Sequence, residues 1–582
     1  MAASVRHRSA GPLIGLATAA AALGAAQPTA ALLGVSPPVT VVADAVVDHS
    51  PFGLVAWAIA VFGPADKAVL VTGILLVLAA VAGAAGTLAL RRPAAGYTIL
   101  GAVALMGLAA AWLRRTDDPG ATLPVLAAAL AGALALTFLR RTLPAPAPPG
   151  TSGTSGMSGG SGADGATVAE ALETGGAAVS GATAETPGAV MDDAAVGAGR
   201  AAEDVGADGA TVAEAPETGG AAGAGGTAGP DRRAVVASAG VIAAGAVAGG
   251  AGLWLPSALR RTGGPDALRL PAAADALPAL APGTDLGVPG LSPFFTPNDD
   301  FYRIDTALTV PRLDSDRWRL RVHGMVDRPF EIDLAELLDL PLVEADVTLT
   351  CVSNPVGGSL VGNARWLGYP LAELLRRAGV HADADQILAT SHDGWTCGTP
   401  TEVVMDGRDA LLAIGMNGRP LPHEHGFPVR VVVPGLYGYV SATKWVTDIE
   451  LTRFADASAY WADRGWAERG PIKTMSRIDV PGDFTRVPAG EVTVAGVAWA
   501  QHTGIDAVEV RLDKGAWQPA ELARVPGIDT WVQWVTEVVV GPGMHALEVR
   551  ATDATGFTQS HVEVETIPDG AEGRHYLRFT AE

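Results

Sequence analysis

The feature that most constrains this chain is a set of long, uncharged apolar stretches within its first 260 residues. Crossing the hydrocarbon core of a bilayer takes about 20 mostly apolar residues in a helix. Stretches of that length predict an N-terminal α-helical transmembrane bundle, with four helices in 1–141 and a fifth in 232–256. A shorter apolar run at 53–63 carries a Trp and predicts an interfacial or re-entrant segment instead. The five predicted spans cover 11–35, 68–90, 97–113, 120–139 and 234–255.

Arginines at the ends of these stretches predict the orientation of the bundle. Short loops rich in Lys and Arg stay on the cytoplasmic side. Four clusters fit that side, whereas Arg114 and Arg115 fall on the other side and are followed directly by two Asp residues. With five spans, the C-terminal half is predicted to be extracytoplasmic, in a multi-pass protein of the cell membrane. The four clusters are Arg6 with Arg8, Arg91–Arg92, Arg140–Arg141 and Arg232–Arg233.

The stretch between the fourth and fifth spans has a composition that does not support a folded core. Residues 142–231 are rich in Pro, Gly, Ala and Ser, and the segment 162–178 recurs almost unchanged at 206–222. Such a low-complexity segment buries too little apolar surface to offset its chain entropy, so we expect a disordered cytoplasmic linker. The pair Arg232–Arg233 after it is either a positive-inside signal or a degenerate internal twin-arginine signal.

The chain changes character near residue 290, where Trp, Tyr, His and charged residues become frequent. Strand-like and helical stretches are mixed over 290–470, which predicts an α+β domain. Short strand-like runs separated by turns over 471–582 predict a β-sandwich. The α+β part contains VTLTCV, VRVVVPG, DLAELLDL and PLAELLRRAGV, and the sandwich part contains VTVAGVAW, AVEVRL, WVQWVTEVVV, HALEVRATD and HVEVETI.

Charge and motifs exclude several classes of function. The formal net charge is −21 and no tract is rich in Lys or Arg, which argues against a nucleic-acid partner. The sequence has no HExxH, CxxC, CxxCH or Walker motif. It has no GxSxG nucleophile elbow either, because its one GxSxG match, GMSGG at 156–160, lies in the low-complexity stretch. Zinc proteases, c-type haem proteins, α/β-hydrolases and P-loop enzymes are therefore not indicated.

The two cysteines are the residues that carry the most chemical information. Cys351 closes the strand-like VTLT and opens the loop CVSNPVGG, and a strand end is where a pocket commonly begins. By residue type alone, an inert buried thiol is the favoured explanation for Cys351, and it also explains Cys397 in GWTCGTP. The residues around Cys351 are needed to decide.

Five segments after residue 290 resemble, in order, the sulfite oxidase family of molybdopterin enzymes. The resemblance runs from about 290 to the C-terminus, and its long block HGFPVRVVVPG with a downstream Lys-Trp is its most specific part. The membrane region lies outside it. The segments are TPNDDFYR at 296–303, TLTCVSNPVGG at 348–358, NARWLGYPLAELL at 363–375, MNGRPLPHEHGFPVRVVVPGLYGYVSATKWV at 416–446 and PIKTMSRI at 471–478.

The resemblance implies a Mo-molybdopterin cofactor and assigns residues to it. In that family a cysteine thiolate binds molybdenum beside the two sulfurs of the pterin, and the matching residue here is Cys351; soft thiolates suit such a metal. A buried phosphate favours a fork-shaped cation, and the pterin ring favours hydrogen bonds from polar side chains. The implied cofactor contacts are Asn298, Phe301, Tyr302, His425, Arg430, Ser441 and Lys444.

The resemblance also implies catalytic residues and a substrate. Arg365 matches a family arginine that points into the substrate pocket, where it would stabilise developing negative charge. Tyr437 and Tyr439 are candidates to donate a hydroxyl to the substrate or to pack in the core. Sulfite oxidases carry arginines directly after the Cys-x-x-Asn stretch, whereas here Asn354 is followed by Pro-Val-Gly-Gly. The predicted anion pocket is weaker, which favours a small S-oxide, N-oxide or other oxo substrate as an alternative to sulfite.

The favoured hypothesis is therefore a molybdopterin-dependent oxidoreductase that transfers an oxygen atom and exchanges electrons with a separate cytochrome or quinone-linked carrier. The resemblance implies an immunoglobulin-like C-terminal domain of the dimerisation type, so a homodimer is expected. One alternative is a membrane-tethered binding or scaffolding protein with a metal-free version of the fold. Another is a transporter or sensor in which the helices are the functional part, although the predicted spans carry no central ionisable residue.

Overall fold

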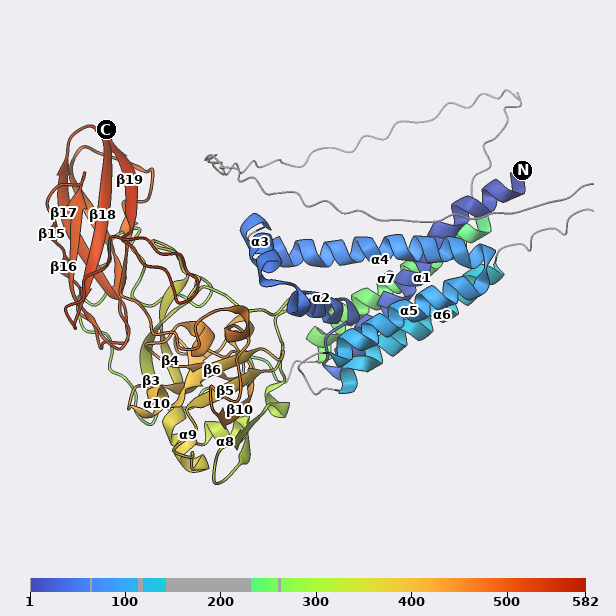
Figure 1. The fold of residues 1–582 in the computed structure, drawn as a ribbon, viewed down its shortest axis with the longest axis horizontal. Helices are drawn as coiled ribbons and strands as arrows, with labels where there is room; N and C mark the ends of the chain where they lie inside the picture. The colour runs from blue at the N-terminus through green and yellow to red at the C-terminus, as the bar shows by residue number, and fades with distance from the viewer. Residues whose placement is uncertain (1, 63–64, 114–118, 143–231, 260–262) are drawn as a thin grey trace, which may run out of the picture. The chain divides into compact units, whose positions relative to one another are not determined.

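A computed structural model describes residues 2–62, 65–113, 119–142, 232–259 and 263–582 (Figure 1). The predicted disordered linker falls outside the described residues, except for Thr142, and so do Arg114 and Arg115. In the described part, α-helices make up the chain before residue 260, and β-sheets with a few short helices make up the chain after residue 310.

The five predicted spans are helices that are long and apolar enough to cross a membrane. The run predicted to be interfacial forms α3, an 11-residue helix that is too short to span. A further short helix, α2, precedes it. The N-terminal helices are α1 (Ala2–Leu33), α2 (Pro38–His49), α3 (Phe52–Phe62), α4 (Asp66–Arg91), α5 (Pro93–Trp112), α6 (Leu123–Arg141) and α7 (Arg232–Leu259).

Glycines in α1 explain why this helix packs closely against two others. A Cβ atom at Gly15 would lie 1.8 Å from the carbonyl oxygen of Ala82 in α4. A Cβ atom at Gly24 would lie 2.4 Å from the carbonyl oxygen of Gly245 in α7. Small residues that let helix backbones approach in this way are typical of helix contacts within a membrane.

Two sheets and three short helices follow, in agreement with the predicted α+β class. One sheet has the strand order β2-β1-β10-β5-β6, and the other has the order β3-β4-β7-β8 with β9 paired to β7. The elements are β1 (Arg319–Gly324), β2 (Phe330–Asp333), α8 (Leu334–Leu338), β3 (Val343–Thr350), β4 (Val361–Pro370), α9 (Leu371–Ala378), β5 (Gln386–Ser391), β6 (Thr396–Pro400), α10 (Thr401–Met405), β7 (Leu411–Met416), β8 (Arg419–Pro420), β9 (Arg430–Val432) and β10 (Val446–Thr452).

The antiparallel pair β3–β4 has two chemically different faces, because successive side chains of a strand point to opposite sides. On one side Val347 and Trp366 are fully buried in an apolar cluster with Phe301 and Phe427, and we call this side the apolar face. The other side, which we call the polar face, carries the cross-strand pairs Asp346 with Arg365 and Thr348 with Asn363. The two faces have separate roles below.

Residues after 470 form two further sheets around a shared core. Their strand orders are β11-β13-β17-β16 and β12-β19-β18-β14-β15. Val494 and Trp534 of the first sheet pack with Val510 and Leu547 of the second. The strands are β11 (Met475–Val480), β12 (Arg486–Val487), β13 (Gly490–Trp499), β14 (Ile505–Leu512), β15 (Gln518–Pro519), β16 (Glu521–Leu522), β17 (Val532–Val540), β18 (Gly543–Asp553) and β19 (Tyr576–Ala581).

One predicted strand is wrong. The alternating sequence HVEVETI at 561–567 is irregular, and its only β-bridge in the described chain joins Val564 to Glu572. The reason is that both edges of β18 are already occupied, by β14 on one side and by β19 on the other. The sequence HVEVETI therefore has no strand edge beside β18 on which to form a ladder.

Candidate functional site

Cys351 lies directly after β3, at the point where the chain leaves the sheet. Its amide donates to the carbonyl of Leu360 (2.9 Å), and its own carbonyl accepts from the amide of Asn354 (3.0 Å). The side chain of Asn354 closes the same loop, because its Oδ1 accepts from the amide of Leu360 (2.8 Å). Burial raises the pKa of the Cys351 thiol, although hydrogen bonds from Ser353 partly oppose this. A metal cation bound to this sulfur would hold it as a thiolate.

Arg430, at the start of β9, is a buried cation on the apolar face. It is only 5% exposed, and its guanidinium carbon lies 5.0 Å from the centre of the Trp366 ring. Its Nη1 donates to the carbonyl of His425 (3.2 Å). Burial lowers the pKa of Arg430 to about 10, an effect that Tyr302 partly offsets. Within the described part of the chain, no carboxylate lies within ion-pair distance of Arg430. A buried cation of this kind calls for an anionic ligand.

His425 ends the short 3₁₀ turn His423–His425 and contributes a neutral ring. Its Nε2 lies 2.9 Å from the carbonyl oxygen of Asn298, so this nitrogen carries the proton. Nδ1 is then an acceptor. Burial, followed by the charge of Arg430, lowers the pKa of His425 to about 4. The ring is uncharged at neutral pH and can offer a hydrogen-bond acceptor.

Lys444 is the second buried cation of the site, and it differs from Arg430 in having an acid partner. Its Nζ donates to Oδ2 of Asp305 (2.6 Å) and to the carbonyl of Glu424 (3.1 Å). Burial lowers the pKa of Lys444 to about 8, although Asp305 opposes this. Despite its own burial, Asp305 has a lowered pKa because of Lys444 and Arg303. The pair is ionised at neutral pH, but Asp305 also pairs with Arg303 (2.8 Å), so one carboxylate serves two cations.

The predicted entry segment lies beside these groups. Phe301 stacks on Tyr302 (5.3 Å between ring centres) and meets the His425 ring edge-on (5.6 Å). Burial, followed by the charge of Cys351, raises the pKa of Tyr302, so its hydroxyl stays protonated within electrostatic reach of both Cys351 and Arg430. Asn298 is held by Asn417, whose Nδ2 donates to its Oδ1 (2.8 Å). Five predicted residues therefore gather on one side: Cys351, Tyr302, Phe301, His425 and Arg430.

The hydroxyl of Ser441 bonds only within its own loop in the described structure. It lies 3.0 Å from the carbonyl oxygens of both Leu436 and Tyr437, and the residue is fully buried. This arrangement fixes the turn that follows Tyr437. The role that the structure supports for the Ser441 hydroxyl is to shape the loop.

Arg365 lies on the polar face and is not brought together with the cluster around Cys351. Its Nε and Nη2 donate to the two oxygens of Asp346 (2.7 and 2.8 Å), and its Nη1 donates to the carbonyl of Pro278 (3.1 Å). In the β3–β4 ladder Arg365 is opposite Asp346, whereas Val361 is opposite Thr350 beside Cys351. Four residues of strand separate the two positions, which is about 13 Å. The structure thus places Arg365 in an ion pair midway along the β3–β4 ladder.

The two tyrosines of PGLYGY differ in what they contact. Tyr437 is 3% exposed, and its hydroxyl accepts from the amide of Lys473 (3.4 Å). Burial raises the pKa of Tyr437 to about 12, and Asp569 and Cys351 add to the effect. Cys351 is therefore near enough to act on this hydroxyl electrostatically. The hydroxyl of Tyr439 instead donates to the carbonyl of Ala467 (2.7 Å).

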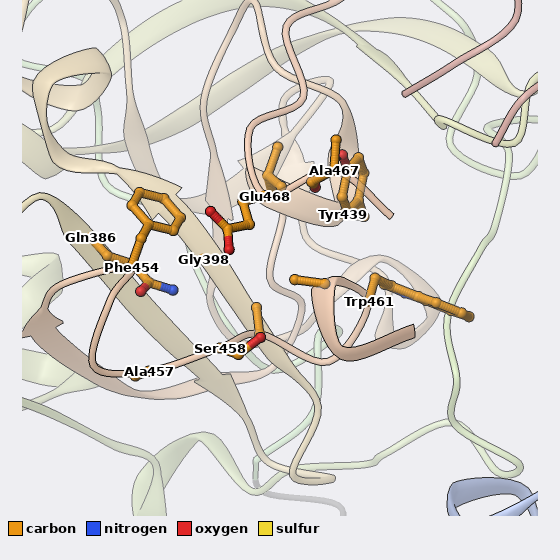
Figure 2. Close-up of a pocket in the computed structure, with 12 residues that line it drawn as sticks. Gln386, Gly398, Tyr439, Phe454, Ala457, Ser458, Trp461, Ala467 and Glu468 are labelled. Carbon is orange, nitrogen blue, oxygen red and sulfur yellow. The ribbon is translucent and has the colours of Figure 1, made fainter. Parts of the chain in front are cut away.

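Tyr439 lines a small cavity between β5, β6 and the loop 454–468 (Figure 2). The cavity measures about 10 Å³, which is room for one water molecule. Gln386 lies at its wall, and its Oε1 is buried without a hydrogen-bond partner. None of the predicted cofactor contacts lines this cavity, so a structural water is the occupant that its size and polarity suit.

Three functional neighbours were not predicted from the sequence. Trp366 was part of the quoted NARW block, but only the structure shows its ring beneath Arg430. Asp305 pairs with Lys444 from 139 residues away, and no local signal marks it. Ser353 hydrogen-bonds to the Cys351 sulfur. The loop motif Cys-Val-Ser-Asn was the available signal for Ser353.

The chain is similar in sequence to several known proteins. The family described as "Oxidoreductase molybdopterin binding domain" matches residues 307–461. Sulfite oxidase of Gallus gallus is 30% identical over 312 residues, which is 45% of this chain and 67% of that protein. The uncharacterized oxidoreductase YuiH of Bacillus subtilis is 33% identical over 157 residues, which is 27% of this chain and 76% of that protein. Human mitochondrial sulfite oxidase is 30% identical over 304 residues, 44% of this chain and 55% of that protein.

These matches define an oxidoreductase domain that binds molybdopterin. The chain belongs to the sulfite oxidase family, and Mo-molybdopterin is the cofactor that this membership implies. The chain spans about half the length of the mammalian relatives that it matches. The residues fit the cofactor, because the cluster combines a buried thiol with a buried guanidinium that has no acid partner among the described residues.

Proposed function

We propose that this chain is a membrane-anchored oxidoreductase that transfers an oxygen atom to or from a small sulfur- or nitrogen-oxo compound. The observation that carries the proposal is the cluster of Cys351, Tyr302, His425 and Arg430 on the apolar face. When bound, the cofactor would supply a metal that changes its oxidation state by two electrons. The protein's part is to seat the cofactor and to position the substrate.

Each residue of the cluster has a defined task in this proposal. Cys351 would ligate the metal through its sulfur, which burial otherwise keeps protonated. Arg430 would bind the cofactor phosphate with the charge that no carboxylate in the described chain neutralises. His425 would accept a hydrogen bond at Nδ1 because Nε2 is committed to Asn298. Tyr437 would donate its hydroxyl hydrogen to a substrate oxygen.

The charges around Tyr437 favour a substrate without a negative charge. The pKa of Tyr437 is raised by burial and also by Asp569 and Glu572, two acids on the segment before β19. Lys473 is ion-paired with both of these acids, at 3.0 and 2.8 Å, so it has no charge to spare for an anion. The loop after Cys351 contributes no arginine, and Arg365 is bound to Asp346. A neutral S-oxide or N-oxide fits these surroundings better than sulfite does.

The remaining parts of the proposal concern the setting of the enzyme. The five apolar helices would anchor it in the cell membrane, with the catalytic half on the extracytoplasmic side. The two C-terminal sheets would be an immunoglobulin-like sandwich that pairs two copies of the chain. Electrons would be exchanged with a separate cytochrome or quinone-linked carrier, because the sequence carries no c-type haem motif.

The test is metal analysis of the full-length chain, purified in detergent from a host that makes the cofactor. Wild type and Cys397→Ala are expected to contain near-stoichiometric molybdenum, because Cys397 is a buried thiol outside the cluster. Cys351→Ala is expected to lose the metal or to hold it without activity. Folded wild-type protein that contains no molybdenum would overturn the proposal and leave a tethered binding module as the better account.

A further inference from the structure

The strand that leads to Cys351 is an edge strand whose outer side is covered by the C-terminal sheets. β3 is the first strand of its sheet, so one row of its backbone groups has no neighbouring strand. The amide of Thr348 donates to the carbonyl of Asp529 (2.9 Å). The carbonyl of Thr348 accepts from Nε2 of Gln501 (2.9 Å). Residues of the C-terminal part therefore satisfy the backbone of β3 three positions before Cys351.

Side chains tighten the same contact. Nε2 of Gln501 also lies 3.0 Å from Oγ1 of Thr350, the residue directly before Cys351. The amide of Trp531 donates to Oγ1 of Thr348 (2.8 Å). Gln501 is 3% exposed and both threonines are buried, so water does not compete for these bonds.

The loop that follows Cys351 is held from the same C-terminal part. Arg477 on β11 donates from Nη1 to the carbonyl of Gly358 (2.8 Å), and its Nε donates to Asp479 (2.6 Å). The ring of His575 fills the space beside Gly357: a Cβ atom there would lie 2.2 Å from Cδ2 of the ring. Gly357 has a φ of +73°, a conformation that suits glycine.

An apolar cluster lies between the contacts to β3 and the contacts to the loop after Cys351. Val361, which is opposite Thr350 in the ladder, is buried with Phe294, Met475, Trp499 and Trp531. Three of these residues belong to the C-terminal part. Tight packing on both sides of Cys351 leaves the loop little freedom to move.

We infer that Gln501 and Arg477 are positioning residues that fix the sulfur of Cys351 from the C-terminal sheets. Gln501 holds the strand before the cysteine, and Arg477 holds the loop after it. The C-terminal part would then serve the metal site directly, in addition to any role in pairing two chains. This inference rests on the proposed function for its purpose, but its geometry can be tested without the cofactor.

The test compares the two cysteines of the full-length, cofactor-free chain by rates of alkylation with iodoacetamide, resolved by peptide mass spectrometry. In Gln501→Leu the rate at Cys351 is expected to rise about 5- to 30-fold, the factor that local opening by loss of a buried hydrogen bond produces. The rate at Cys397 should stay unchanged, because this residue lies on β6 and is 0% exposed. Arg477→Met should act like Gln501→Leu, and Arg477→Lys should restore part of the protection.

Gln533→Leu is the matched control for Gln501→Leu; it is not one for Arg477, which also contacts Ser292 (2.9 Å). Gln533 is also a buried C-terminal amide with two backbone partners, Ser292 and Leu286, and it touches neither β3 nor the loop after Cys351. It should leave the Cys351 rate near that of wild type. An equal rise at both cysteines, or no rise at Cys351, would overturn the inference.

A second readout uses the cofactor-loaded enzyme. Gln501→Leu is expected to keep its molybdenum but to shift the sulfur-to-metal charge-transfer absorption, because the ligand sulfur is held less firmly. If this absorption band is unchanged in Gln501→Leu, Gln501 does not position the sulfur of Cys351 in the cofactor-loaded enzyme. If wild type holds no metal, the proposed function fails, while the alkylation result still decides whether Gln501 and Arg477 position Cys351.

Discussion

Arg430 and Arg365 are carried by strands of the same sheet, yet they meet opposite surroundings. Arg365 forms a two-pronged ion pair with Asp346 on the polar face. Arg430 lies over Trp366 with no carboxylate beside it in the described chain. Burying a charge is costly unless a partner compensates for it. Arg365 has its negative partner within the chain, and our proposal is that a bound ligand supplies the negative charge for Arg430.

The largest expected effect comes from removing the unpaired arginine. Arg430→Met should weaken cofactor binding by about 4 kcal/mol, roughly 1,000-fold, because a buried charge pair with the phosphate is lost. The cofactor-free chain should not lose stability, since the substitution removes an uncompensated buried cation. The measurement is molybdenum content after dialysis, with Arg365→Met as the matched control. If Arg430→Met retains its molybdenum, Arg430 does not bind the cofactor and the contrast with Arg365 fails.

Removal of Arg365, the ion-paired arginine, should instead lower stability and leave cofactor binding unchanged. Arg365→Met leaves the carboxylate of Asp346, whose side chain is 3% exposed, without its partner. We expect a loss of about 3 kcal/mol in unfolding free energy, at the low end for buried pairs because Arg365 is 18% exposed. The double variant Arg365→Met/Asp346→Leu should recover most of it in urea denaturation. If turnover is lost while stability is kept, Arg365 acts on substrate as the family resemblance implies.

The apolar face should also be the acid-sensitive one. Burial and the charge of Arg430 lower the pKa of His425 from 6.5 to about 4. Between pH 4 and pH 6.5 the unfolded chain binds the proton more readily than the folded chain does. The contribution of neutral His425 to the unfolding free energy is therefore fully present above pH 6.5 and falls as the pH drops toward 4. We expect the cofactor-free chain to lose about 2 kcal/mol between pH 7 and pH 5 through this residue. The measurement is the urea midpoint of wild type and of His425→Gln at several pH values between 7 and 5. If the midpoints of both proteins fall equally with pH, His425 is not the cause.

Much of this arrangement could be read from the sequence, for physical reasons that differ between regions. The five long apolar helices were predictable because the length and lack of charge of these stretches suffice to define them. The family was predictable because the residues around Cys351, from TLTC to HGFPVR, form a specific pattern. Both signals are local in the chain.

The side of the sheet on which each arginine lies was not predictable in the same way. It depends on the register of β3 against β4 and on the bulge between Leu367 and Gly368 where β4 pairs with β7. A shift of one residue would exchange Arg365 with Trp366. Non-local partners such as Asp305 for Lys444, and the occupied edges of β18 that leave 561–567 irregular, also arise only when the chain is folded.

The smallest expected effect concerns Tyr437 and Tyr439. As with the two arginines, one side chain has its partner within the chain and the other does not. The hydroxyl of Tyr437 accepts from Lys473 and has no acceptor for its own hydrogen among the described residues, whereas the hydroxyl of Tyr439 donates to Ala467. Tyr437→Phe should therefore lower kcat/KM about tenfold, or about 1.4 kcal/mol, while leaving stability unchanged. Tyr439→Phe should lower the unfolding free energy by about 1 kcal/mol and leave kcat/KM unchanged. The reverse pattern would place the substrate beside Tyr439, on the side of the loop that faces the small cavity, and would move the proposed substrate position away from Cys351.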